Sequence, residues 1–314
     1  MQIPSFSEIK IAYKRIKNYI HNTPVLSSNS INKICGAEIF FKCENFQKVG
    51  AFKIRGATNA IFSLSNEDAE KGVATHSSGN HAQALALAAK WRGIKSYVVM
   101  PKNSPQVKIN AVRGYGAEIT FCEPNLMARE NGLSKVVEKT GATFIHPYDN
   151  YNVICGQGTA ALEFLKKVPN PDIIMTPVGG GGLLSGTAIT VSTISDKIKI
   201  IAGEPAGADD AFRSFKSGKL ILQTNPQTIA DGLLTSLSDL TFHIITKLVD
   251  DILTVKEENI KKAMQLIWER MKIIVEPSAA VPLGAILENP ELFSDKKIGI
   301  ILSGGNVDLE KLPW

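Results

Sequence analysis

Residues 73–100 read VATHSSGNHAQALALAAKWRGIKSYVVM, and this stretch decides the fold class. The apolar run 73–76 predicts a short strand, the alanine-rich segment after it predicts a helix ended by Gly93, and residues 94–100 predict a second strand. A strand, a helix and another strand in succession are the repeating unit of a parallel sheet that is covered by helices.

The same alternation continues on both sides of this stretch. Further strands are expected at 37–44, 117–123, 143–147, 172–178, 197–205, 251–255, 273–277 and 297–303, and further helices at 7–20, 105–113, 125–139, 157–167, 183–194 and 257–272. Two such runs, 73–147 and 150–303, predict an α/β protein with two lobes and a cleft between them. Parallel sheets bind ligands at the carboxyl ends of their strands, so the turns there are candidate sites.

Composition excludes several classes of function. The net charge is +5 without a long basic run, so no nucleic-acid partner is expected. No apolar stretch is long enough to span a bilayer, and the N-terminal segment does not resemble a secretion signal. Four cysteines lack metal-ligand spacing, which indicates free thiols and a cytoplasmic location. These are Cys35, Cys43, Cys122 and Cys155.

Three turns at the predicted carboxyl edges carry small polar residues. Ser77, Ser78, Gly79 and Asn80 follow the strand 73–76. They are typical of a helix N-cap, and equally of a site for a carboxylate or phosphate. The run 179–182 is four glycines between a strand and a helix. It predicts a phosphate-binding loop better than a mobile linker, and it lacks the lysine of a Walker loop. Ser303 ends the last strand, where an ordinary turn is the simpler interpretation.

The stretch GAFKIRGA (50–57) contains a lysine in apolar surroundings. Lys53 lies between Phe52 and Ile54, whereas most lysines are solvated surface charges. The flanking Gly50 and Gly56 are expected to leave room for a ligand. Arg55 gains no role from the sequence alone.

Together these segments resemble the fold-type II enzymes that depend on pyridoxal phosphate (PLP), in the serine racemase and serine/threonine dehydratase branch. The matching segments are FFKCENFQKVGAFKIRGA, SSGNHAQA, CGQGTAALE, PVGGGGLLSG, GEPAGADDAFRSFKSGKL, TIADG, WERMKIIVEPSAA and LSGGNVDL. The resemblance implies a two-lobed α/β fold like that of tryptophan synthase β, with parallel sheets covered by helices. It also implies a large PLP-binding lobe of residues 1–67 and 149–314, a small mobile lobe of residues 68–148, and a homodimer.

The resemblance also implies roles for individual residues. Lys53 would form the Schiff base with the cofactor, which requires a deprotonated amine that burial favours. Phe52 would lie against the pyridine ring, and Asn80 would bind its 3′-oxygen. Ser303 would face the ring nitrogen. The phosphate would be held by Gly179, Gly180, Gly181 and Gly182.

The substrate is expected at the same place. Its carboxylate would be bound by the turn that contains Ser77, Ser78, Asn80 and His81, and Arg129 would approach when the small lobe closes. A racemase needs a second proton carrier opposite Lys53, and the Ser78 hydroxyl can serve as one. An N-cap or a carboxylate ligand is the competing interpretation of Ser78.

The resemblance further implies a divalent cation (Mg²⁺, Mn²⁺ or Ca²⁺) and a nucleotide effector. The cation would bind Glu204, Asp210 and the Ala208 carbonyl, all hard oxygen ligands. The polar positions Lys48, Gln83, Lys272 and Asn306 match an ATP site at a subunit interface. One departure is Tyr148, which stands where some members have an asparagine at the cofactor.

The expected function is therefore interconversion of L- and D-serine, with serine and threonine dehydration from a shared α-carbanion. Three alternatives stay open. The first is a dehydratase for threonine or 3-hydroxyaspartate without significant racemisation. The others are a cysteine-synthase-type β-replacement enzyme and a non-enzymatic nucleotide-binding protein.

Overall fold

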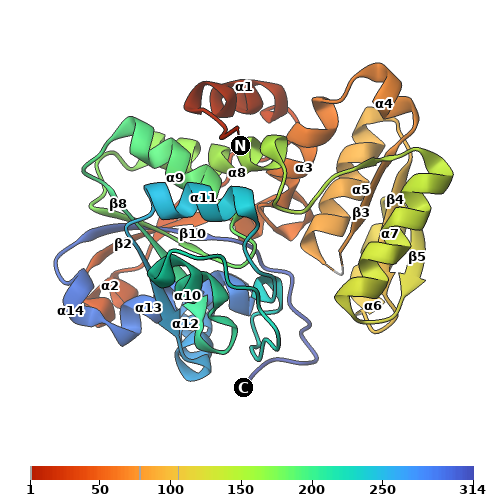
Figure 1. Ribbon diagram of the computed structural model, residues 1–314. Coiled ribbons are helices and arrows are strands. Elements are labelled where there is room, and N and C mark those ends of the chain that lie inside the picture. The colour runs from red at the N-terminus through yellow and green to blue at the C-terminus, as the bar shows by residue number, and fades with distance from the viewer. Residues whose placement is uncertain (1, 78, 105) are drawn as a thin grey trace.

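The computed structural model describes residues 2–77, 79–104 and 106–314, and these form two sheets (Figure 1). The six-stranded sheet has the order β1-β2-β10-β7-β8-β9, and the four-stranded sheet has the order β5-β4-β3-β6. All neighbouring strands are parallel except β1 and β2. The strands are β1 (Val25–Ser27), β2 (Glu38–Cys43), β3 (Val73–His76), β4 (Ser96–Pro101), β5 (Glu118–Cys122), β6 (Thr143–Phe144), β7 (Ile173–Pro177), β8 (Lys199–Pro205), β9 (Asp251–Val255) and β10 (Lys297–Leu302).

Helices cover both faces of each sheet. The α-helices are α1 (Phe6–Ile16), α2 (Asn29–Cys35), α3 (Lys53–Phe62), α4 (Asn66–Glu70), α5 (Asn80–Arg92), α6 (Gln106–Gly114), α7 (Leu126–Thr140), α8 (Tyr151–Lys167), α9 (Gly182–Ile194), α10 (Asp210–Ser217), α11 (Asp239–Leu248), α12 (Glu257–Met271), α13 (Pro277–Glu288) and α14 (Pro290–Phe293). Short 3₁₀ turns are η1 (Glu44–Phe46), η2 (Lys48–Gly50), η3 (Ala206–Ala208) and η4 (Asp231–Leu233). No helix of the described residues is long and apolar enough to cross a membrane.

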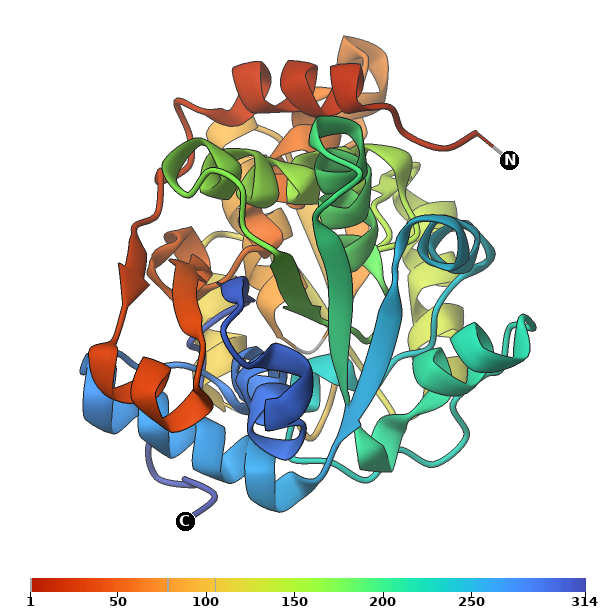
Figure 2. The same ribbon diagram turned by 90° about the vertical axis from the view of Figure 1, so that its left-hand side faces the viewer.

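The six-stranded sheet is buried between two layers of helices. Helices α8 and α9 contact one face, and α13 contacts the other, as Figures 1 and 2 show. The central strand β7 is buried at every position, because it presents apolar side chains to both helix layers.

The four-stranded sheet shows the two-residue period of strand side chains. Val73 and Val98 face the core formed with α5 and α6, whereas Ala74 and Val99 face the core formed with α7. In Figure 1 this sheet and its helices lie to the right of the larger sheet. The exact lobe boundary, 68–148, stays a prediction.

Helix α3 connects the two parts, because it packs against α8 of the larger sheet and α5 of the smaller one. The contact with α8 depends on glycine. A Cβ atom on Gly156 would lie 2.5 Å from the Arg55 carbonyl oxygen and 2.6 Å from the Gly56 Cα atom. The backbones of α3 and α8 therefore touch, and Lys53 begins a helix that has little freedom to shift.

Two expectations about the elements were wrong. Residues 273–276 belong to no strand of the described chain; instead the Glu276 N–H donates to the Gly304 carbonyl at 3.0 Å, and α13 follows at once. Helix α8 begins at Tyr151 and not at 157, because the Asn150 side chain caps it by accepting from the Val153 N–H at 3.0 Å.

Candidate active site

A cavity of about 310 Å³ lies at the carboxyl ends of strands from both sheets. Its walls include His76 at the end of β3, His146 after β6, the glycines after β7 and Ser303 after β10. This is where an open parallel sheet is expected to bind a ligand. The structure thus brings the three polar turns and Lys53 together around one cavity.

Lys53 is the first residue of α3 and extends into this cavity. Its Nζ donates to the Pro147 carbonyl at 3.1 Å and lies 5.1 Å from the centre of the Phe52 ring. Burial lowers the pKa of Lys53 to about 8, although the Glu276 carboxylate opposes the shift. The amine is therefore much easier to deprotonate than an exposed lysine, as a Schiff-base lysine requires.

The glycine run 179–182 forms one wall of the cavity and leads into α9. A Cβ on Gly180 would lie 2.3 Å from the Tyr148 ring, and one on Gly179 would lie 2.9 Å from the Leu233 Cα. Gly181 has a φ of +84°, which favours glycine. The loop brings backbone N–H groups and the start of a helix to the cavity, an arrangement that suits a phosphate.

The turn before α5 supplies Ser77 to the cavity, and the first turn of α5 supplies Asn80 and His81, while Ser78 lies outside the described residues. The Asn80 amide donates to both oxygens of Glu276, at 3.0 and 3.1 Å. Its own oxygen accepts from the Asn306 amide at 2.9 Å. The Asn80 side chain is thus held by two neighbours at the cavity wall.

The His81 side chain is already engaged within the protein. Burial lowers its pKa to about 3, so the ring is neutral, and its Nε2 lies 3.1 Å from the Ile145 carbonyl oxygen, to which it donates. The remaining nitrogen, Nδ1, is an acceptor and repels a carboxylate. Only the backbone N–H of His81, in the first turn of α5, remains for binding a substrate carboxylate.

Ser303 has a buried hydroxyl whose oxygen finds no partner among the described residues. Its carbonyl accepts the Phe52 N–H at 3.0 Å, so the serine is fixed beside the residue that precedes Lys53. Because Ser303 also lines the cavity, its unpaired hydroxyl is available to a ligand group. The lysine, the glycine loop and this hydroxyl fit the aldehyde, the phosphate and the ring nitrogen of PLP.

Several cavity residues were not expected from the sequence, among them Glu276 and His146. Burial raises the pKa of Glu276 to about 7, which makes it a carboxyl group that titrates near neutrality. A carboxylate within the apolar stretch IIVEP and a histidine directly after an apolar strand were the available signals. Neither signal points to a cavity by itself.

Arg129 and Tyr148 also line the cavity. The Nε of Arg129 is buried and has no partner among the described residues, so it is available for an anion. The Tyr148 ring packs over Gly180, since a Cβ atom there would collide with the ring, and a Cβ on Gly182 would lie 2.9 Å from the Tyr148 Cβ. Tyr148 therefore forms an aromatic wall beside the glycine loop.

The glycines that flank Lys53 do not leave room for a ligand, contrary to expectation. A Cβ on Gly50 would lie 2.5 Å from the Asn306 side-chain oxygen. A Cβ on Gly56 would lie 2.3 Å from the Gln157 side-chain nitrogen, on helix α8. Both glycines permit contacts within the protein.

The expected metal ligands lie around one turn between β8 and α10. Both Glu204 oxygens accept backbone N–H groups, from Ala211 at 2.9 Å and Phe212 at 2.7 Å, and burial raises the pKa of this carboxyl to about 9. Asp210 is buried, and its Oδ2 has no partner in the described chain. Two buried carboxyl groups and the Ala208 carbonyl fit a hard cation. No cluster of three histidine, cysteine or acidic side chains occurs among the described residues.

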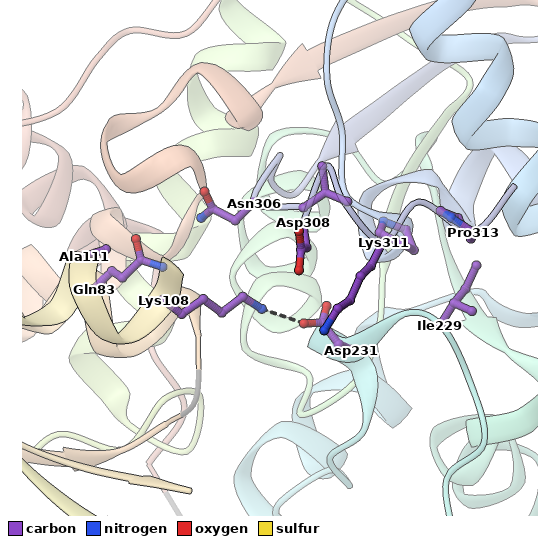
Figure 3. Close-up of a pocket in the computed structure, with 11 residues that line it drawn as sticks. Gln83, Lys108, Ala111, Ile229, Asp231, Asn306, Asp308, Lys311 and Pro313 are labelled. Atoms are coloured by element: carbon purple, nitrogen blue, oxygen red, sulfur yellow. Dashed lines mark hydrogen bonds and ion pairs between the residues drawn. The ribbon is translucent and has the colours of Figure 1, made fainter. Parts of the chain in front are cut away.

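A second cavity, of about 400 Å³, lies beside the first (Figure 3). Of the four positions expected to bind ATP, Gln83 and Asn306 line it. Lys48 and Lys272 do not; the Lys48 ammonium lies 4.9 Å from the Trp91 ring centre. An ion pair of 2.6 Å between Lys108 and Asp231 separates the two cavities, since both residues line both of them.

The fold and this site are those of an α/β enzyme with a ligand cavity between two parallel sheets. Comparison with known proteins leads to the same class. The model of the pyridoxal-phosphate dependent enzyme family matches residues 16–304, and the chain belongs to this family. It is therefore a PLP-dependent enzyme, which excludes a non-enzymatic nucleotide-binding protein.

Three relatives show how similar the chain is to characterised members. It is 52% identical to a β-hydroxyaspartate dehydratase of Paracoccus denitrificans, over 100% of both chains. The crystal structure of a serine racemase from Dictyostelium discoideum superposes with a TM-score of 0.93 at 55% identity, covering 98% of this chain and 99% of that one. The processed form of threonine deaminase isoform 2 from Solanum lycopersicum superposes with a TM-score of 0.92 at 31% identity, covering 99% of this chain and 93% of that one.

Proposed function

We propose that the protein interconverts L- and D-serine and also dehydrates serine and threonine. Bound PLP supplies a ring that accepts the electron pair left on the substrate α-carbon. Lys53 removes or returns the α-proton on one face, and Ser78 does so on the other. The similarity to the Dictyostelium serine racemase supports this proposal.

The observation that carries the proposal is the unpaired Ser303 hydroxyl in the cavity with Lys53. A hydroxyl cannot keep the ring nitrogen protonated as a carboxylate would. The electron pair is therefore held less firmly, and the α-carbon is reprotonated or expels its β-substituent. These two outcomes are racemisation and dehydration.

The decisive experiment replaces Ser78 by alanine in the PLP-loaded enzyme. We expect the formation of D-serine from L-serine to be lost, while pyruvate release from L-serine is largely kept, because elimination needs only the Lys53 face. Chiral chromatography and a pyruvate assay measure the two products, with Lys53→Ala as the inactive reference. Equal loss of both activities would count against two proton carriers.

A second candidate is dehydration of 3-hydroxyaspartate, favoured by the Paracoccus relative and by the unpaired Nε of Arg129. A second carboxylate on the substrate would satisfy this unpaired guanidinium nitrogen. If this is the main reaction, Arg129→Met will raise KM for 3-hydroxyaspartate far more than for serine. Sulfide-dependent product from serine would instead indicate β-replacement.

We further propose a divalent cation, Mg²⁺, Mn²⁺ or Ca²⁺, at Glu204, Ala208 and Asp210, and ATP as an effector in the second cavity. The unpaired Asp210 oxygen supports the cation site. The amide side chains and lysines shown in Figure 3 support the ATP site. A homodimer in the cytoplasm completes the proposal. Titration with ATP, compared between the wild type and Gln83→Ala, tests the effector site.

A further inference from the structure

His146 lies beside the reacting amine and has no role in the proton transfers described above. The residue that follows it, Pro147, accepts the Lys53 hydrogen bond at 3.1 Å. The His146 ring lines the cavity and packs edge-on against Tyr148, with ring centres 4.5 Å apart. His146 is therefore the neighbour in the chain of Pro147, whose carbonyl oxygen contacts the Lys53 amine. That amine is the group expected to face the substrate's α-carbon.

The backbone determines which ring nitrogen of His146 carries the proton. Its Nδ1 accepts the N–H of Asp149 at 2.8 Å and that of Tyr148 at 3.3 Å. A nitrogen that accepts hydrogen bonds carries no proton, so a neutral ring carries it on Nε2. Burial lowers the pKa of His146 to about 4, Asp149 opposes the shift, and His76 and Lys53 reinforce it. The ring is therefore neutral at pH 7.

The Nε2–H of His146 has no hydrogen-bond partner among the described residues. The Nε2–H of His81, in contrast, donates to the Ile145 carbonyl oxygen. In the proposed reaction the substrate carboxylate is bound at the start of α5, and its α-proton faces Lys53. The β-substituent is the substrate group that still lacks a binding partner. The free Nε2–H donor of His146 lies on the cavity wall formed by residues 146–148.

We propose that His146 donates a hydrogen bond from Nε2 to the β-hydroxyl oxygen of the substrate and thereby promotes dehydration. This inference rests on the proposed function. During elimination the Cβ–O bond breaks with its electron pair on oxygen, and a double bond forms between Cα and Cβ. The proton taken from Cα by Lys53 passes to that oxygen, and water leaves. His146 keeps its proton and stabilises the negative charge that develops on oxygen.

The test compares two leaving groups in the PLP-loaded enzyme. Hydroxide leaves from L-serine and needs the donor, whereas chloride leaves readily from β-chloro-L-alanine. We expect His146→Phe to lower pyruvate release from L-serine about 100- to 1,000-fold, which is the loss seen when one such donor is removed. Release from β-chloro-L-alanine and racemisation of serine are expected to stay within about twofold of the wild type. His146→Gln, which retains a donor, is expected to recover part of the loss.

Matched measurements distinguish a donor to the leaving group from a ring that only shapes the cavity. His76→Phe changes the other partly exposed imidazole of the cavity. This substitution is expected to change pyruvate release from L-serine and from β-chloro-L-alanine by the same factor. Nitrogen-15 NMR of the wild-type ring is expected to show a proton on Nε2 at pH 7. Equal losses from serine and β-chloro-L-alanine in His146→Phe, or a proton on Nδ1, would overturn the inference. A wild-type enzyme that acts on neither substrate would instead contradict the proposed function.

Discussion

Lys53 and Arg55 lie two residues apart at the start of α3, and burial has opposite consequences for them. The Lys53 amine faces the cavity and is easily deprotonated, whereas Arg55 is completely buried and permanently charged. Arg55 bonds to Glu44 at 2.7 and 2.8 Å and to Glu163 at 2.7 and 3.1 Å. Lys42 donates to the same Glu163 at 2.6 Å. This neutral group of four charges anchors the first turn of α3, and with it Lys53.

Removing the Arg55 charge is expected to destabilise the protein strongly. Arg55→Met leaves Glu44 and Glu163 facing only one cation, and breaking a buried ion pair from one side costs about 3–5 kcal/mol. Urea unfolding of the apoprotein measures the free energy of unfolding. Lys102→Met removes an exposed ion pair with Glu123 and serves as the control, for which little change is expected. Similar effects of the two substitutions would contradict this view of the cluster.

The lowered pKa of Lys53 predicts how cofactor attachment depends on pH. Only the deprotonated amine attacks the PLP aldehyde, so the rate of covalent attachment to the apoprotein should rise with pH around a midpoint near 8. An exposed lysine would place this midpoint at about 10.4. Glu276→Gln removes the carboxylate that favours the ammonium form and should move the midpoint lower. Borohydride trapping followed by mass spectrometry measures the rate, and an unchanged midpoint in Glu276→Gln would refute the assigned cause.

At the scale of elements, glycines in α8 determine how closely neighbouring helices approach. Gly156 touches the backbone of α3, and a Cβ on Gly158 would lie 2.7 Å from the Gly186 carbonyl oxygen of α9. Glycine weakens an isolated helix, so Gly156 and Gly158 lower the intrinsic stability of α8. Close packing with α3 and α9 offsets that cost and sets the position of Lys53.

A methyl group at this helix contact is expected to be costly. Gly156→Ala forces backbone atoms of α3 and α8 apart and should destabilise the protein by about 1–3 kcal/mol, as overpacking does. It should also weaken PLP binding, because α3 carries Lys53. Gly114→Ala adds the same methyl group at the end of α6, where nothing lies within 4 Å, and should leave the melting temperature unchanged or slightly higher. Thermal unfolding of both variants decides the matter.

At the scale of the whole molecule, segments distant in the sequence meet at the cavity. The order of the large sheet places β10 between β2 and β7, so Ser303 lies beside Phe52 although they are far apart in the chain. The Lys108–Asp231 ion pair connects α6 with η4 between the two cavities. The site therefore depends on both sheets keeping their relative position.

The proposed cation site predicts a response of global stability to metal. A cation that binds only the folded protein stabilises it by about 2.7 kcal/mol at a hundredfold excess over its Kd. Chelation should therefore lower the melting temperature of the wild type by several degrees, and Mg²⁺ should restore it. Glu204→Gln should abolish this response, whereas the exposed Asp196→Asn should retain it. A full response in Glu204→Gln would rule out this site.

Features that depend on neighbouring residues could be predicted from the amino-acid sequence alone. Strand–helix alternation, the glycine run after a buried strand and the lysine in apolar surroundings all lie within short segments, and their resemblance to known PLP enzymes identified the cofactor. Periodicity also predicted β3 and β9 residue for residue. Such patterns can be recognised in a sequence because helix and strand propensity, and the spacing of buried residues, depend on residues only a few positions apart.

Only the tertiary structure decided the roles of Arg55, Glu276, His146 and the flanking glycines. Each depends on a partner that the chain order does not reveal: Glu163 for Arg55, Asn80 for Glu276, and α8 for Gly56. His146 needed the backbone N–H groups of the turn after it to be oriented before its protonated nitrogen could be assigned. Burial and hydrogen bonding between distant segments determine these charges and donors, and both exist only once the sheets and helices have packed together.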